Sequence, residues 1–143
     1  MGRDQASVRG RRVLLADSDL EVQQTVKLVA ARYGHEIILA ATGAEVLAHA
    51  AESRPDLIIL DTLLPDADGR DVLARLKAGV GTAHIPVVVW SGGREERQSE
   101  RRIALDLGAE DYVDMVNAQL LMARLQRLFL RLWRTSEATD RPK

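Results

Sequence analysis

Two carboxylates in this sequence each follow an apolar run, and each would bring reactive or ligand-binding chemistry to the end of a strand. Asp61 follows residues 57–60, and Asp17 follows residues 13–16. An apolar run without a polar break is typical of a parallel strand that is covered on both faces. Because ligands of open α/β sheets gather at the carboxyl ends of the strands, we expect Asp17 and Asp61 to share one pocket.

The elements that must position these acids alternate along the chain. Apolar runs predict five strands, and apolar residues at helical spacing, together with cap signals, predict five helices. Right-handed crossovers turn this alternation into a doubly wound parallel sheet with helices on both faces, so the expected fold class is α/β. The expected strands are 13–17, 37–40, 57–61, 87–90 and 112–113, and the expected helices are about 19–33, 42–53, 68–79, 94–107 and 117–133.

Length and composition indicate one domain without disulfides. The chain has 143 residues, a formal net charge of −1 and no cysteine. A broad basic field is absent, so we expect no nucleic-acid binding. No apolar run has the length of a membrane span and no secretion signal is present, so we expect a cytoplasmic protein. The expected organisation is a flexible arm, one folded domain and a flexible tail, over residues 1–11, 12–134 and 135–143.

Further short motifs follow Asp61 along the chain. They are Pro65, Gly69, the pair Ser91-Gly92, and the run Gly108-Ala109-Glu110-Asp111-Tyr112. Together they resemble the response-regulator receiver domain, the aspartate-phosphorylated module of bacterial two-component signalling. The resemblance covers about residues 12–133. It implies the flavodoxin-like (βα)5 form of the α/β fold, with a five-stranded parallel sheet in which strands one and three lie side by side.

The resemblance also implies a role for each matching residue. Asp61 would accept a phosphoryl group, and Asp17, Asp61 and Leu63 would hold magnesium. Ser91 and Tyr112 would form the switch that responds to phosphorylation. Transfer to a carboxylate builds negative charge beside existing negative charge, so cations and donors must stabilise it. A receiver is a signalling module, not an enzyme, and its partner would be a histidine kinase or another signalling protein.

Three positions depart from the receiver pattern. Ser18 stands where the family has a second acid, and Met115 and Val116 replace a lysine–proline pair. A hydroxyl is a poor substitute for a carboxylate on a hard cation, and a thioether brings no charge to a phosphoryl group. We therefore expect weak or absent magnesium binding. The expected function is that of an atypical receiver, weakly phosphorylated or phosphorylation-independent, which acts through protein contacts.

Two other interpretations of these residues stay open. One is an ordinary phosphoacceptor receiver that uses Asp61 and magnesium, with Asp19 compensating for Ser18. The other is a small phosphatase of the haloacid-dehalogenase type, because Asp17 and Asp19 form an Asp-x-Asp motif after an apolar run. Residues 18–21 also have the spacing of a capping box, which predicts that Ser18 caps the first helix.

The last expected helix has a broad apolar face. This face is wider than packing against one sheet requires, and arginines line the opposite flank of the helix. We expect the face to contact a partner protein or to pair with a second copy of the chain. Its members are Leu121, Leu125, Phe129 and Trp133, and the arginines are Arg124, Arg127, Arg131 and Arg134.

Overall fold

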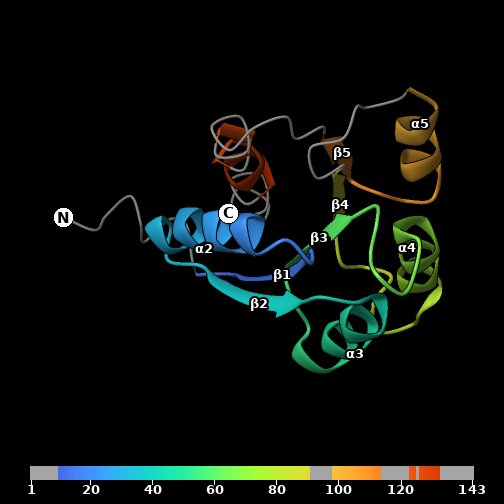
Figure 1. Ribbon diagram of the computed structural model, residues 1–143, viewed down its shortest axis with the longest axis horizontal. Helices are drawn as coiled ribbons and strands as arrows, with labels where there is room; N and C mark the ends of the chain where they lie inside the picture. The colour runs from blue at the N-terminus through green and yellow to red at the C-terminus, as the bar shows by residue number, and fades with distance from the viewer. Residues whose placement is uncertain (1–9, 91–97, 114–122, 125, 133–143) are drawn as a thin grey trace, which may run out of the picture.

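Five parallel strands form one sheet in the order β2-β1-β3-β4-β5. The computed structural model describes residues 10–90, 98–113, 123–124 and 126–132 (Figure 1). The strand bounds are β1 Arg12–Ala16, β2 Glu36–Ala40, β3 Leu57–Asp61, β4 Val87–Trp90 and β5 Asp111–Val113. This sheet, in which β1 and β3 are neighbours, confirms the expected fold class.

Helices connect the strands and cover both faces of the sheet. Their bounds are α2 Leu20–Arg32, α3 Gly43–Ser53, α4 Gly69–Ala78 and α5 Gln98–Asp106. Residues 123–124 and 126–132 are also helical and belong to the expected last helix. Figure 1 shows α2 and this last helix on one side of the sheet and α3 and α4 on the other. Residues 1–9 of the expected arm and residues 135–143 of the expected tail lie outside the described residues.

The core consists of two apolar clusters, one on each face of the sheet. In β1, Leu14 belongs to the cluster under α3 and α4, whereas its neighbour Leu15 belongs to the cluster under α2 and the last helix. Ile58 and Ile59 of β3 divide between the two clusters in the same way. Successive side chains of a strand point to opposite faces, so a strand covered on both faces needs an unbroken apolar run.

The start of α2 corrects one expectation. Asp19, not Ser18, caps this helix: its carboxylate accepts hydrogen bonds from the backbone N–H groups of Glu21 at 2.8 Å and Val22 at 3.4 Å. Aspartate is as good a cap as serine, and the helix begins at Leu20. The expectation that Ser18 caps the helix was therefore wrong by one residue.

A threonine and a glutamate three residues later cap the start of α3. The Thr42 hydroxyl accepts from the Glu45 N–H at 3.1 Å, and the Glu45 carboxylate accepts from the Ala41 N–H at 2.8 Å.

Among the described residues, none of the helices has the length and apolar character needed to cross a membrane.

Candidate functional site

The structure brings Asp17 and Asp61 together at the carboxyl edge of the sheet. Ala16 of β1 pairs with Leu60 of β3, so the two acids follow neighbouring positions on adjacent strands. Asp17 is 1% exposed and Asp61 is 6% exposed. Their charges interact, because the charge of Asp61 contributes to a raised pKa of Asp17. The sequence therefore predicted the placement of both acids correctly.

Both carboxylate oxygens of Asp17 already accept hydrogen bonds from the chain. Oδ1 accepts from the Asp19 backbone N–H at 2.8 Å, and Oδ2 accepts from the indole Nε1–H of Trp90 at 3.2 Å. Burial nevertheless raises the pKa of Asp17 to about 6, with a smaller contribution from the charge of Asp61. The two hydrogen bonds act in the opposite direction because they favour the charged form.

Trp90 is a site residue whose role the sequence reasoning missed. It ends β4, is 2% exposed and belongs to the same apolar cluster as Val26 and Val29 of α2. Its position at the end of the fourth expected strand indicates the carboxyl edge of the sheet, but not a contact with Asp17. The available signal was chemical, because a buried indole N–H normally finds an acceptor and the nearest acids stand at strand ends.

The loop after β3 holds Asp61 in a tight arrangement. The Leu63 backbone N–H donates to Asp61 Oδ1 at 3.2 Å, and the Gly69 N–H donates to the Thr62 carbonyl at 2.9 Å. A Cβ on Gly69 would lie against the Asp61 carbonyl oxygen and 2.8 Å from the Thr62 Cα. Glycine is therefore needed at this position because the backbones approach so closely.

Asp66 fixes the same loop to α3, a contact that the sequence did not reveal. Its Oδ1 accepts from the Gly43 N–H at 2.7 Å, and its Oδ2 accepts from the Ala44 N–H at 3.2 Å. These hydrogen bonds, chiefly the one from Gly43, lower the pKa of Asp66. A carboxylate at the first turn of a helix satisfies free N–H groups and the positive end of the helix dipole.

Of the two expected switch residues, the structure describes only Tyr112. Its ring is buried, and its hydroxyl donates to Glu100 Oε1 of α5 at 3.1 Å. The Arg101 guanidinium donates to the Tyr112 carbonyl at 3.0 Å. Tyr112 also lines a cavity of about 180 Å³ that reaches Thr62 and Leu63 after β3. Ser91, Met115 and Val116 lie outside the described residues.

The described residues do not fit a complete magnesium site. Ser18 offers no carboxylate, both oxygens of Asp17 are engaged, and the Asp19 carboxylate holds the first turn of α2. In the part of the chain that the structure describes, no group of three acids, histidines or cysteines could hold a metal ion. Asp19 uses its Oδ1 to cap α2, and whether it compensates for Ser18 stays a prediction.

The expected partner face on the last helix needs a correction at Phe129. This ring is 1% exposed and packs edge-on against Tyr33 and His35, with centroids 6.1 Å and 5.1 Å away. The end of α2 and the start of β2 therefore cover Phe129, which makes it a core residue and not a contact surface. Leu121, Leu125 and Trp133 lie outside the described residues.

Comparison with known proteins agrees with this geometry. The response regulator receiver domain model matches residues 13–126. The chain is 40% identical over 101 residues to the transcriptional regulatory protein KdpE of Mycobacterium tuberculosis, which covers 71% of this chain and 42% of that protein. The chain spans about half the length of the curated relatives it matches.

Solved structures match over most of their length. The phosphorylated cyanobacterial phytochrome response regulator RcpA has a TM-score of 0.78 at 27% identity, covering 90% of this chain and 96% of that chain. The Mn²⁺-bound form of response regulator Rcp1 has a TM-score of 0.72 at 26% identity, covering 86% and 94%. None of these matches supports the phosphatase interpretation. Because the family match runs from the first strand into the last helix, this chain belongs to the response regulator receiver domain family.

Proposed function

We propose that this receiver domain of two-component signalling acts mainly through protein contacts, and that Asp61 is phosphorylated weakly or not at all. Receiver domains bind magnesium in their active site and respond to histidine kinases or related signalling proteins. In this chain we propose that magnesium binding is weak or absent. The observation that carries the proposal is the pair of hydrogen bonds that occupy both oxygens of Asp17.

The energetic argument begins with what a cation must displace. A divalent ion that binds Asp17 Oδ2 in place of the Trp90 N–H loses that hydrogen bond, and a hydrogen bond to a charged group contributes about 1.5–3 kcal/mol. A loss of this size lowers cation affinity roughly 10-fold to 150-fold. In addition, Ser18 offers no carboxylate ligand to the cation. Both effects weaken cation binding, and phosphoryl transfer to a carboxylate requires the positive charge of that cation.

The substitution at Met115 acts on the same reaction. A lysine at this position would neutralise the phosphoryl group, whereas a thioether offers neither charge nor a strong donor. Loss of one preorganised donor costs on the order of 3 kcal/mol in the transition state of other enzymes. Slow phosphorylation of Asp61 follows from the combination of Ser18, Met115 and the Trp90 contact.

A second candidate function is that of an ordinary phosphoacceptor. The feature that favours it is the retained loop around Asp61, where Gly69 permits the close backbone approach and Leu63 donates to the carboxylate. In that case a histidine kinase would supply the phosphoryl group.

Pairing of two copies through the last helices stays a proposal, and it would use Leu121, Leu125 and Trp133 without Phe129.

Labelling with acetyl phosphate and magnesium, followed by intact-mass measurement, tests the proposal. We expect little phosphorylated wild type, and more in the double variant Ser18→Asp with Met115→Lys than in either single variant. Asp61→Asn controls for labelling elsewhere. Substantial labelling of the wild type that depends on Asp61 would show the ordinary phosphoacceptor instead.

A further inference from the structure

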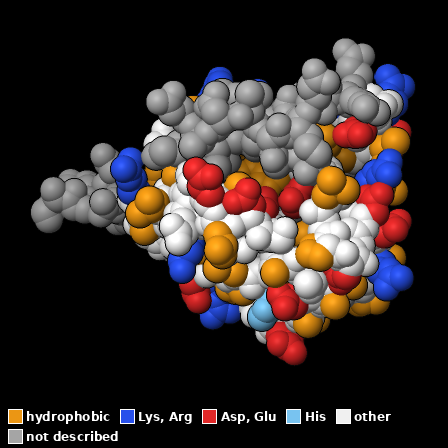
Figure 2. Space-filling view, in the orientation of Figure 1, with side chains coloured by type: hydrophobic (Ala, Val, Ile, Leu, Met, Phe, Trp, Pro, Cys, Tyr) orange, Lys and Arg blue, Asp and Glu red, His pale blue; other side chains and the backbone are white. Residues whose placement is uncertain are grey.

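His35 is a buried titratable residue that phosphoryl transfer does not use. It directly precedes β2, so it lies at the amino edge of the parallel sheet, opposite the edge that carries Asp17 and Asp61. On the face shown in Figure 2, acidic and basic side chains are widespread, whereas histidine forms only a small patch. His35 itself is 7% exposed. Such burial favours the neutral form of a histidine, because the charged form would lose its hydration.

A hydrogen bond also selects the neutral form of the His35 ring. Nδ1 accepts from the Arg11 backbone N–H at 3.0 Å, and a ring nitrogen accepts only when it carries no proton. The Glu36 N–H donates to the Arg11 carbonyl at 2.8 Å, so both backbone groups of Arg11 are bonded to residues 35 and 36. A second proton on the ring would turn Nδ1 into a donor that faces another donor.

The charged groups around His35 act in opposite directions. Burial lowers the pKa of His35 to about 4, and the charge of Arg11 adds to this effect. Asp56, which lies before β3, favours the charged ring, but its Oδ2 already accepts from a backbone N–H at the start of β1 at 2.8 Å. The end of α2 contributes the phenol ring of Tyr33, and the last helix contributes the uncharged ring of Phe129.

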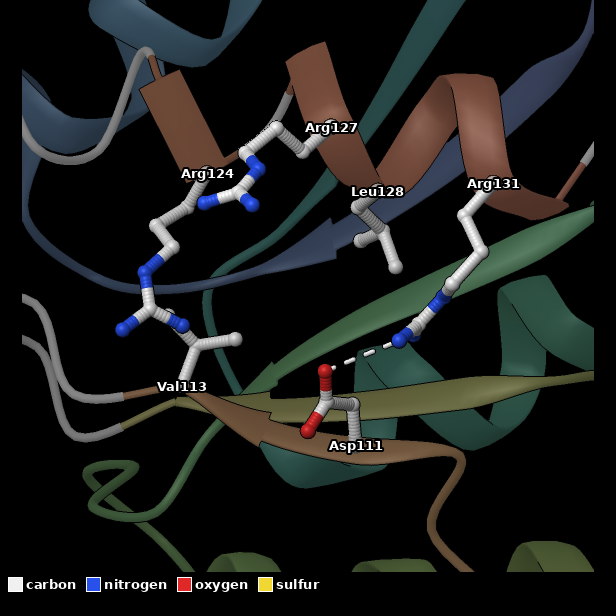
Figure 3. Close-up of a pocket in the computed structure, with 6 residues that line it drawn as sticks. All are labelled: Asp111, Val113, Arg124, Arg127, Leu128 and Arg131. Carbon is white, nitrogen blue, oxygen red and sulfur yellow. Dashed lines mark hydrogen bonds and ion pairs between the residues drawn. The ribbon is translucent and has the colours of Figure 1, made fainter.

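The His35 ring helps to attach the last helix to the rest of the domain. It stacks on Tyr33 with centroids 6.1 Å apart, and it meets Phe129 edge-on with centroids 5.1 Å apart. The other flank of the helix packs loosely, because an open concavity of about 440 Å³ is lined by this flank and β5 (Figure 3). There Arg131 lies 3.4 Å from Asp111, and the two side chains are 56% and 23% exposed. An ion pair this exposed contributes little to stability.

We propose that His35 makes this attachment acid-sensitive, and that its protonation releases the last helix from α2. The proton removes the hydrogen bond from the Arg11 N–H and places a charge beside the Arg11 guanidinium. Aromatic rings attract a cation, but they do not replace its hydration or the lost hydrogen bond. The charged ring gains water when the helix that carries Phe129 moves away. Phosphorylation of Asp61 has no part in this device.

The direction of the pH effect follows from the lowered pKa. The folded state binds the proton more weakly than the unfolded state, in which the pKa is 6.5. The contribution of His35 to stability is therefore complete above pH 6.5 and is lost as the pH falls towards 4. Asp17 acts in the opposite direction, since its pKa is raised by folding. A variant that retains Asp17 but lacks the imidazole separates the two effects.

Hydrogen exchange of the full chain at pH 7 and pH 5, followed by NMR and corrected for the intrinsic exchange rates, tests the proposal. The reference is His35→Asn, which keeps an acceptor oxygen but does not titrate. From pH 7 to pH 5 the opening constant of amides in residues 126–132 should rise up to about 20-fold more in the wild type than in this variant. The amides of β3 should stay protected in both proteins.

The matched control is His84→Asn, which removes an exposed histidine and should keep the pH dependence of the wild type. If His35→Asn does not fold, His35→Phe serves as the reference, because it keeps an aromatic ring and does not titrate. Three results would overturn the proposal. They are the same pH dependence with and without His35, titration of the His35 ring carbons at pH 6.5 or above, and opening of β3 to the same extent as the last helix.

Discussion

Replacement of Trp90 by phenylalanine separates the two consequences of its bond to Asp17. The change removes the indole N–H but keeps an aromatic ring in the apolar cluster. Loss of a hydrogen bond to a buried acid lowers the free energy of unfolding by about 1.5–3 kcal/mol, and the smaller ring adds about 1 kcal/mol. We therefore expect a destabilisation of about 2.5–4 kcal/mol at neutral pH.

The same substitution should strengthen cation binding. Asp17 Oδ2 loses its donor in Trp90→Phe, so a divalent ion no longer competes with the indole for that oxygen. The affinity for magnesium should rise about 10-fold or more, which corresponds to a gain of at least 1.4 kcal/mol. A variant that is less stable but binds the ion more tightly would be difficult to explain by loss of packing alone.

Isothermal titration with magnesium and urea unfolding measure the two effects on the same protein. The other tryptophan of the chain supplies the matched control, because Trp133→Phe is the same chemical change at another position of the sequence. Unchanged or weaker magnesium binding in Trp90→Phe would refute the competition between indole and cation. It would also remove the main support for weak magnesium binding in the wild type.

Three further predictions concern stability. Because the folded pKa of Asp17 is about 6 against 3.8 for the free group, the folded state binds the proton more tightly. The free energy of unfolding of the wild type, relative to that of Asp17→Asn, should fall by at most about 3 kcal/mol as the pH rises from 4 to 7. Urea unfolding measures both free energies against pH, and parallel curves would contradict this. Gly69→Ala should lower the free energy of unfolding by about 1–3 kcal/mol, because the added methyl group overpacks the loop. Gly81→Ala, where nothing lies within 4 Å, should cost much less, and thermal unfolding of both compares them. Phe129→Ala should lower the free energy of unfolding by about 3–5 kcal/mol. Leu130→Ala, at a side chain that is 38% exposed, should lower it little. Equal effects in urea unfolding would contradict the placement of Phe129 in the core.

The fold and the strand-end acids follow from local pattern. Apolar runs ending in Asp17 and Asp61 define buried parallel strands, and the topology then brings the two acids to one edge of the sheet. Helix boundaries were less certain, because Ser18 and Asp19 are both good caps and the sequence does not choose between them.

The contacts that the sequence missed are long-range. Trp90 and Asp17 are 73 positions apart, and Asp66 reaches the start of α3 across 23 positions. No spacing rule connects such residues, since their meeting depends on the folded sheet. Phe129 illustrates the same limit: a helical wheel gives the side on which it lies, but not that Tyr33 and His35 cover it.

The contact between Asp66 and α3 makes two backbone amides into reporters of the loop that carries Asp61. Gly43 and Ala44 donate to Asp66, a residue outside the helix, because the first N–H groups of a helix have no partner within it. Any displacement of the loop breaks these bonds and exposes both amides to exchange with water. Hydrogen exchange at Gly43 and Ala44 therefore measures how often the loop opens, without a probe attached to the site itself.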